Sequence, residues 1–384
     1  MLLVVVSCSG NDGGNTEKIE IDGLPSEFSR LTEVWELLSR EQIDGAGLDP
    51  QVISDGAIRG MLAASGDPYA GFLDQEQYSL EREDIQGFFG GIGAEVGIRD
   101  GVATILAPMP DTPAEAAGVR PGDIILEVDG VSIQDMTLLE IVQLIRGEEG
   151  TIVTILLRHL SSPEPVAVEI ERDIIKLESV NLLMQVGRIG HMRISGFTGS
   201  TDDELQEALE RFERSKGVGI VLDLRNNPGG LVSSVVDVTS QFIEEGLVLY
   251  QLDAKGDRRN WGVKSGGKAL DIPMVVLVNE FSASASEVFA GAIIDNNRAT
   301  VIGSTTFGKG SVTNLWPLND GSGVNFTTAR WFTPNGSLIE GEGLTPDVVL
   351  DTVDEDEDED IQLDRAIEIL KEQLEEGTSA RSSK

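Results

Sequence analysis

The stretch GIVLDLRNNPGG, residues 219–230, decides the fold class of this chain. Residues 219–224 form a short, mostly apolar run of the kind that makes a buried strand, and Pro228 with the two following glycines predicts a turn. Gly229 and Gly230 permit close backbone approach and leave N–H groups pointing outward, which suits an oxyanion site. The alternative is an ordinary strand-to-helix turn.

Further strand–turn–helix units lie on both sides of this stretch. Residues 189–194 read as a strand and residues 201–216 as the helix that follows it. Residues 274–279 are another buried strand, followed by a predicted helix at 285–295. Repeated units of this kind favour parallel strands joined by helices, so we predict an α/β core with sites at the carboxyl ends of its strands.

The balance of charge is strongly acidic, with 66 acidic and 29 basic residues and a formal net charge of -37. Nucleic acid is not expected as a partner, because phosphate binding needs clustered Lys and Arg. Asp354 to Asp360 is an unbroken acidic run, typical of a solvated, self-repelling segment. A tail helix is predicted after it, at residues 361–374.

Cysteine and histidine are scarce. Cys8 is the single cysteine, so a disulfide within the chain is impossible. With His159 and His191 as the two histidines, neither a metal site nor a Ser-His-Asp triad is expected. We expect no cofactor.

The N-terminus, MLLVVVSC at residues 1–8, resembles the end of a signal peptide. Val5 to Cys8 resembles a bacterial lipobox, whose cysteine would carry lipid and attach the protein to a membrane. That reading implies an extracytoplasmic protein, in the bacterial periplasm or at the outer face of the membrane. The alternative is a frayed apolar terminus with a chance cysteine. No stretch reaches the roughly 18 apolar residues of a membrane-spanning helix.

Residues 16–85 read as a helical segment, with amphipathic helices at 27–39 and 52–64 expected to pack on something larger. Residues 86–172 change to short strands, predicted at 94–98, 102–106, 124–128 and 153–158, with one helix at 137–146. This pattern is typical of a small mixed domain.

Two motifs in the small domain point to peptide binding. AAGVRPGDII at 116–125 resembles the PDZ domain, and the loop Gly90-Gly91-Ile92-Gly93 resembles its carboxylate-binding loop. Glycine N–H groups can converge on a terminal carboxylate, and an adjacent strand edge can accept a peptide as an added strand. Leu138, Ile141 or Val142 would line a pocket for an apolar last side chain. The alternative is that these glycines only form turns.

A serine segment and a lysine segment carry a candidate nucleophile and base. Ser282-Ala283-Ser284-Ala285-Ser286-Glu287 opens the helix predicted at 285–295; such a serine is commonly a cap, and Glu287 has the capping-box spacing from Ser284. Phe307-Gly308-Lys309-Gly310 holds a lysine between two glycines. A lysine base must be neutral, and burial would lower its pKa from about 10.4 to about 7–8.

Together these segments resemble the carboxyl-terminal processing peptidases, or tail-specific proteases, over roughly residues 28–374. DPY at 67–69, TTARWFTP at 327–334 and GEGLTPD at 341–347 belong to the same resemblance. It implies a serine endopeptidase in which Ser284 is the nucleophile and Lys309 the general base. Backbone N–H groups of Ala285 and of Gly229 or Gly230 would hold the oxyanion.

The resemblance also implies a crotonase-like (ClpP/crotonase-type) α/β protease core with an inserted PDZ domain and an N-terminal helical segment. The expected substrates are polypeptides with apolar C-termini. The chain then divides into a signal-like segment and tether (1–15), a helical segment (16–85), the PDZ domain (86–172), the peptidase core (173–350), and the acidic run with the tail helix (351–384).

One position departs from the family pattern. A glutamine commonly stands four residues after the lysine and orients it, whereas this chain has Thr313. A threonine hydroxyl can accept one hydrogen bond from an amine but has a shorter reach. The alternative function is a catalytically weak PDZ scaffold that binds protein tails. A hydrolase of small acyl substrates is disfavoured, because neither Gly-x-Ser-x-Gly nor Ser-x-x-Lys occurs.

Overall fold

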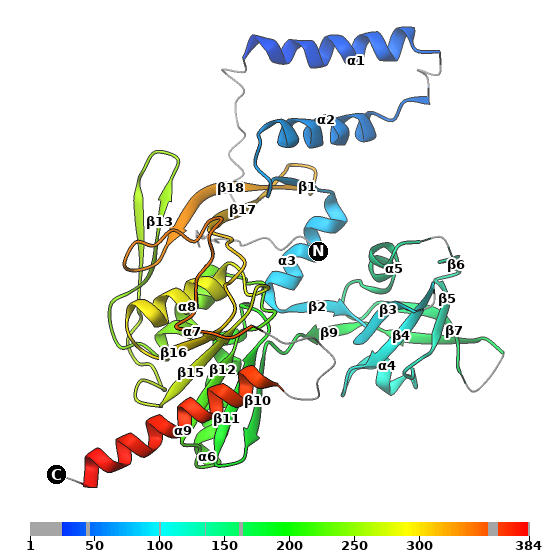
Figure 1. Ribbon diagram of the computed structural model, residues 1–384. Coiled ribbons are helices and arrows are strands. Elements are labelled where there is room, and N and C mark those ends of the chain that lie inside the picture. Colours follow the sequence, from blue (N-terminus) through cyan, green and yellow to red (C-terminus); the bar gives the residue numbers. More distant parts are fainter. Residues whose placement is uncertain are drawn as a thin grey trace.

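A computed structural model shows the fold of the chain (Figure 1). It describes residues 25–43, 47–99, 101–134, 136–160, 164–351 and 360–382. Cys8 with its lipobox-like segment, and all of the acidic run except Asp360, lie outside the described residues. Among the helices in these ranges, none has both the length and the apolar character needed to span a bilayer.

The α/β core is built on a six-stranded sheet. Its order is β10 (Val180–Gln185), β11 (Ile189–Ile194), β12 (Gly219–Asp223), β15 (Met274–Val278), β16 (Thr300–Gly303) and β19 (Val348–Val349). β10 is an antiparallel edge strand, and the other five run parallel. Every residue of β12 and β15 is buried, as expected for parallel strands covered on both faces.

Helices cover both faces of this sheet. On one face of the sheet lie three helices, α6 (Thr201–Arg214), α7 (Val232–Ser240) and α8 (Ala285–Asp295). On the other face lies a single described helix, α9 (Ile361–Ser382). Alternation along the strands decides which side chain faces which layer: Leu222 joins the α6–α8 cluster, whereas Val221 packs with Leu370 of α9.

A second sheet lies beside the core, and one of its strands directly follows the lysine segment in the chain. It contains β1 (Gly71–Leu73), β18 (Gly323–Phe332), β13 (Leu247–Asp253) and β14 (Arg258–Gly262), with β17 (Ser311–Pro317) also paired to β18. The Asp67 carboxylate accepts two hydrogen bonds from Thr327 of β18, one from its backbone N–H at 2.6 Å and one from its hydroxyl at 3.0 Å. This contact joins the DPY motif to the TTARWFTP motif.

The PDZ region has its own sheet and core. The strands are β3 (Ala94–Arg99), β4 (Val102–Pro108), β5 (Ile124–Val128), β6 (Val131–Ser132), β7 (Ile152–Arg158) and β8 (Val166–Glu171), with helices α4 (Pro113–Ala116) and α5 (Leu138–Ile145). β3 is an edge strand, and α5 contacts it. Ile141, offered above as a pocket residue, is instead buried in the PDZ core, whereas Leu138 is exposed and Val142 is half-buried.

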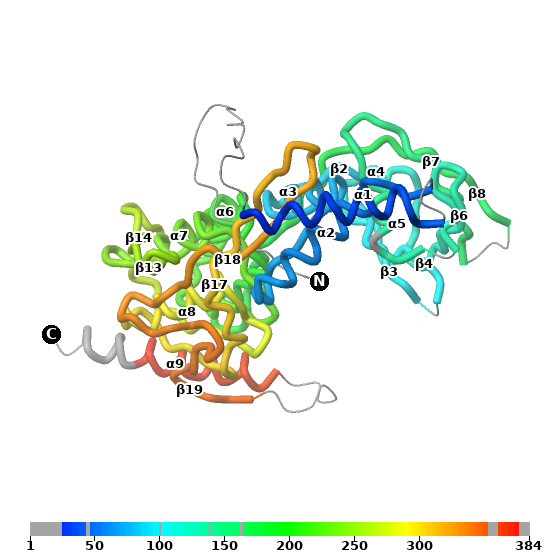
Figure 2. The backbone as a smooth tube through the Cα atoms, turned by 90° about the horizontal axis from the view of Figure 1, so that it is seen from above, coloured from blue at the N-terminus to red at the C-terminus, as the bar shows by residue number. Residues whose placement is uncertain are grey.

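A narrow ribbon connects the PDZ region to the core. β2 (Phe88–Gly91) pairs with β9 (Asp173–Lys176), and α3 (Gln75–Gln86) leads into β2. Figures 1 and 2 both show the PDZ region beside the core, with α3 next to this ribbon.

The N-terminal helices follow a short 3₁₀ turn, η1 (Ser26–Phe28), and are α1 (Ser29–Glu41) and α2 (Pro50–Ala64). Neither helix has a buried residue, and Leu31, Val34 and Leu37 of α1 are exposed. Figure 1 shows α1 beyond α2 on the side away from the core. The expected burial of an apolar face is therefore not seen for α1 among the described residues.

Candidate active site

Ser284 lies between β15 and α8, at the carboxyl edge of the parallel strands. It is completely buried, with φ 56° and ψ -111°. A positive φ in a residue with a side chain costs on the order of 1–3 kcal/mol and persists only where the surroundings enforce it. The Ser284 hydroxyl has no hydrogen-bond partner among the residues that the structure describes. Buried, strained and unbonded, this hydroxyl is available for chemistry.

The two neighbouring serines have structural roles. The Ser282 hydroxyl donates to the carbonyl of Leu224 at 2.8 Å, and the Ser286 hydroxyl donates to the carbonyl of Asn227 at 2.8 Å. Both bonds tie the serine segment to the turn after β12. Of the three alternating serines, Ser284 alone keeps an unbonded hydroxyl within the described part of the chain.

The turn after β12 approaches Ser284 so closely that it requires glycine at position 229. Gly229 has φ 108°, and a Cβ there would lie 2.8 Å from the Ser284 Cβ and 2.9 Å from the Ala285 nitrogen. Ala285 is the first residue of α8, so its N–H has no acceptor within the helix. The turn and this N–H therefore meet beside Ser284.

The N–H groups of Gly229 and Gly230, the two oxyanion donors expected from the sequence, differ in their hydrogen bonds. The Gly229 N–H donates to Asn227 Oδ1 at 2.9 Å and is thus already used. Backbone bonds from Phe197 N–H to Gly229 O and from Leu231 N–H to Phe197 O flank Gly230 without using its N–H.

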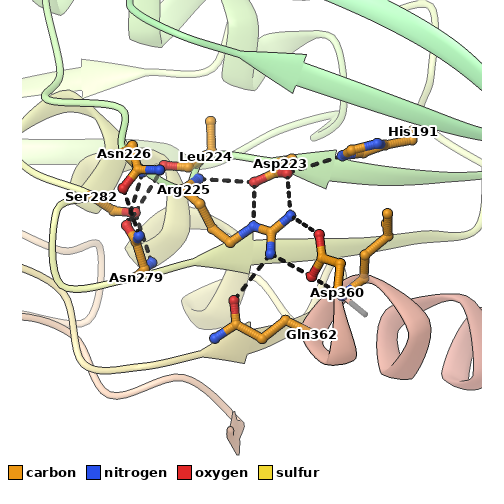
Figure 3. Close-up of polar contacts among 10 residues, drawn as sticks. His191, Asp223, Leu224, Arg225, Asn226, Asn279, Ser282, Asp360 and Gln362 are labelled. Carbon is orange, nitrogen blue, oxygen red and sulfur yellow. Dashed lines mark hydrogen bonds and ion pairs between the residues drawn. The ribbon is translucent and has the colours of Figure 1, made fainter. Parts of the chain in front are cut away.

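Side-chain amides hold the start of this turn (Figure 3). Asn226 has φ 60°, and its N–H donates to Asn279 Oδ1 at 2.9 Å. In return, Asn279 Nδ2 donates to Asn226 Oδ1 at 2.8 Å. Asn279 follows β15, so this pair joins the ends of two adjacent parallel strands.

Glu287, on the first turn of α8, joins the serine and lysine segments. One carboxylate oxygen, Oε2, accepts the N–H of Ser284 at 2.8 Å and the N–H of Lys309 at 2.8 Å. The other, Oε1, accepts the Thr306 hydroxyl at 2.6 Å and the Gly308 N–H at 2.7 Å. The sequence indicated Glu287 only by its capping-box spacing, which did not reveal its contacts with the lysine segment.

Lys309 is buried between β16 and β17, with 7% of its surface exposed. Burial lowers its pKa, while the carboxylates of Glu81, Glu340 and Glu287 act in the opposite direction. Its Nζ lies 5.1 Å from the ring centroid of Tyr69, a cation–π distance. The amine is not hydrogen-bonded to Ser284, whose hydroxyl has no partner in the described residues. The backbone of Lys309 nevertheless lies at the serine segment, because Glu287 Oε2 binds the N–H groups of both residues.

Thr313 does not replace the orienting glutamine in this conformation. It lies in β17, is 1% exposed, and its hydroxyl has no hydrogen-bond partner in the described part of the chain. The register shift of the β17–β18 pair lies between Val312 and Thr313.

The structure separates the residues of the proposed carboxylate-binding loop. Gly90 and Gly91 belong to β2 and pair with β9, and Ile92 is buried in the PDZ core. Gly93, with φ 74°, is the last residue before β3.

A cavity of about 270 Å³ between α3 and the PDZ region is lined in part by Gly90 and Arg146.

Known proteins resemble this chain over most of its length. Residues 188–350 match the model of peptidase family S41, and residues 104–159 match a PDZ domain model. The carboxy-terminal-processing protease of Bartonella bacilliformis is 36% identical over 356 residues, which cover 91% of this chain and 79% of that protein. The carboxy-terminal processing protease CtpA of Bacillus subtilis is 36% identical over 323 residues, covering 84% and 69%.

A solved structure agrees with these matches. The photosystem II D1 C-terminal processing protease aligns with a TM-score of 0.51 and 31% sequence identity, covering 85% of this chain and 94% of the other.

We expect Glu287→Gln to lower the free energy of unfolding by about 2–4 kcal/mol, because one amide oxygen cannot accept four hydrogen bonds and the NH₂ group faces donors. Urea unfolding followed by tryptophan fluorescence measures the change, since Trp331 is buried in the core. Glu280→Gln is the control, because Glu280 is exposed and binds only the Ser304 hydroxyl among the side-chain partners described. Equal stability of the two variants would contradict the central role of Glu287.

Proposed function

This chain belongs to peptidase family S41 and is a PDZ-containing serine peptidase of the carboxy-terminal-processing type; from that premise we propose that Ser284 and Lys309 are its catalytic dyad. One observation carries the proposal. The buried Glu287 carboxylate accepts hydrogen bonds from the backbone N–H groups of both residues. One carboxylate oxygen thus holds a residue with an unbonded hydroxyl and a buried lysine in the same site.

The proposed reaction begins when the Lys309 amine, in its neutral form, takes the proton of the Ser284 hydroxyl. The serine oxygen attacks the carbonyl carbon of the scissile peptide bond, and the N–H groups of Ala285 and Gly230 stabilise the oxyanion. Collapse of this intermediate breaks the C–N bond, and the Lys309 ammonium returns the proton to the leaving amine. Water, deprotonated by Lys309, then attacks the ester carbonyl carbon. The ester C–O bond breaks, the carboxylic product leaves, and the Lys309 ammonium returns the proton to the Ser284 oxygen. The first step requires the amine to move from the Tyr69 ring to Ser284.

We propose that the PDZ region binds the C-terminus of the polypeptide substrate along the edge strand β3. A free strand edge can accept an extended peptide through backbone hydrogen bonds. Leu138 is exposed on α5, next to β3, and would contact an apolar terminal side chain. The loop at Ile92 and Gly93, rather than the paired Gly90 and Gly91, is then the candidate for the carboxylate.

Two further assignments are proposals. The parallel order β11-β12-β15-β16, with helices on both faces, supports a crotonase-like (ClpP/crotonase-type) core. The sequence of Val5 to Cys8 supports an extracytoplasmic protein, in the bacterial periplasm or at the outer face of the membrane, with lipid on Cys8.

Cleavage of an unfolded polypeptide with an apolar C-terminus tests the proposed function. The intact protein should cleave it, and Ser284→Ala should lose essentially all activity, because the attacking oxygen is removed. Ser215→Ala is the control, since Ser215 is an exposed serine at the C-terminal cap of α6. Cleavage by Ser284→Ala would refute the assigned nucleophile. Binding of the polypeptide without cleavage by the intact protein would favour the PDZ scaffold.

The pH dependence of kcat/KM should reveal the state of Lys309. The protonated amine cannot act as a base, so kcat/KM should rise with pH and level off below the usual lysine pKa, because burial lowers the pKa of Lys309. Glu81 opposes that shift, so Glu81→Gln should move the rising limb to lower pH. Glu83→Gln, on the same helix, should leave it in place. A limb that moves to higher pH in Glu81→Gln would contradict the assignment of the base.

A further inference from the structure

The acidic run found in the sequence has no part in the reaction described above, yet its last residue lies beside the active site. Asp360 immediately precedes α9 and caps its N-terminus. Its carboxylate accepts the Leu363 N–H at 3.0 Å, and its carbonyl accepts the Asp364 N–H at 2.9 Å. The same carboxylate also accepts hydrogen bonds from Arg225, a residue of the turn after β12 (Figure 3).

The partner of Asp360 is Arg225, the first residue of the turn that ends in Gly230. Arg225 Nη1 and Nη2 donate to the two Asp360 oxygens, each at 2.7 Å. This is the paired geometry that makes guanidinium–carboxylate contacts strong and directional. The Arg225 side chain is 14% exposed and the Asp360 side chain is 42% exposed, so water reaches this ion pair from the Asp360 side and screens it in part.

Arg225 is held equally firmly from the other side. Its Nε and Nη2 donate to the two oxygens of Asp223 at 2.9 Å and 2.7 Å, and Asp223 also contacts His191 Nε2 at 3.0 Å. Burial raises the pKa of Asp223, but hydrogen bonds from His191 and Arg225 outweigh it and hold that pKa well below its usual range. The guanidinium is therefore fixed between the end of β12 and the start of α9.

Contacts with Ser286 and Phe197 hold the middle and the end of the turn between Arg225 and Gly230, and Arg225 holds its start. Asn226 has a positive φ, and its side chain and N–H bind only Asn279 among the described side chains. Arg225 N–H donates to Asp223 Oδ1 at 3.0 Å, so the guanidinium and the backbone of this residue share one carboxylate. Movement of the guanidinium would therefore disturb the backbone at the start of the turn.

We propose that Asp360 is a positioning residue for the oxyanion turn: by binding Arg225, the start of α9 sets the place of the Gly230 N–H beside Ser284. The inference rests on the proposed function, in which Gly230 is an oxyanion donor. It makes the end of the acidic run part of the active-site support.

Docking of α9 does not itself depend on this contact. Ala366 and Leu370 are fully buried against the sheet, and Ile367 and Leu374 pack beside them. Gln362 adds a hydrogen bond to the Leu350 carbonyl, and its oxygen also accepts from Arg225 Nη1 at 3.2 Å. Loss of the Asp360 carboxylate should consequently disturb the turn more than the helix.

Asp360→Asn tests the proposal, with Asp364→Asn as the matched control. Asp364 is exposed one turn further along α9, so its substitution removes the same charge from the same helix end. Cleavage of the unfolded polypeptide gives kcat and KM, and thermal unfolding gives Tm. We expect Asp360→Asn to lower kcat by about tenfold with KM and Tm nearly unchanged, as for a displaced transition-state donor. Asp364→Asn should stay within about twofold of the parent in both constants.

Two further measurements keep the outcome decisive. In an Arg225→Gln background, Asp360→Asn should cause no additional loss of kcat, because its effect passes through Arg225. Hydrogen exchange should quicken at the amides of residues 226, 227 and 229–231 in Asp360→Asn and stay unchanged at residues 366–370.

Several results would overturn the proposal. These are equal kcat in the two aspartate variants, a full additional loss in the Arg225→Gln background, or faster exchange confined to α9. If the intact protein cleaves nothing, the proposed function fails, and hydrogen exchange at the turn still decides whether Asp360 positions it.

Discussion

The buried carboxylate of Glu287 is the contact on which the active site depends. Ser284 precedes α8 and Lys309 follows β16, so the chain alone does not bring their backbones together. One oxygen of Glu287 accepts the N–H of Ser284 and of Lys309, which fixes both segments against α8. A second chain contact, from Phe307 N–H to the Ser282 carbonyl, supports the same arrangement.

Burial acts on the two ionisable groups of this site in opposite directions. It raises the pKa of Glu287 and lowers that of Lys309, since each charged form loses water. Four hydrogen bonds compensate the Glu287 carboxylate. Lys309 faces the ring of Tyr69, and the charge of Glu81 acts on it against the effect of burial. The site thus combines a well-satisfied carboxylate with a lysine biased toward the neutral form that a base needs.

The helix α3 relates the PDZ region to this site. Its Asp84 forms an ion pair with Arg146 of the PDZ region at 2.9 Å, and the Arg146 guanidinium lies 4.0 Å from the Phe89 ring centroid. Three residues earlier, Glu81 of the same helix acts electrostatically on Lys309. The PDZ region and the candidate active site therefore share one short helix as well as the β2–β9 ribbon.

The sequence by itself determined the elements and the family. Strands 189–194 and 124–128 and helix 285–295 have the predicted bounds, because apolar periodicity and turn residues act over a few neighbours. The order of the motifs sufficed to identify a PDZ-containing carboxyl-terminal processing peptidase, and the family and PDZ domain matches confirm this.

Only the tertiary structure decided which groups are free to act. The hydroxyls of Ser282 and Ser286 donate to backbone carbonyls that are remote in sequence. The Ser284 hydroxyl has no hydrogen-bond partner within the described residues. Gly229 is engaged by Asn227, and Asp360 reaches Arg225 from the far end of the chain. The physical reason is that hydrogen bonds and burial depend on contacts between segments remote in sequence, and no local pattern of residues records these contacts.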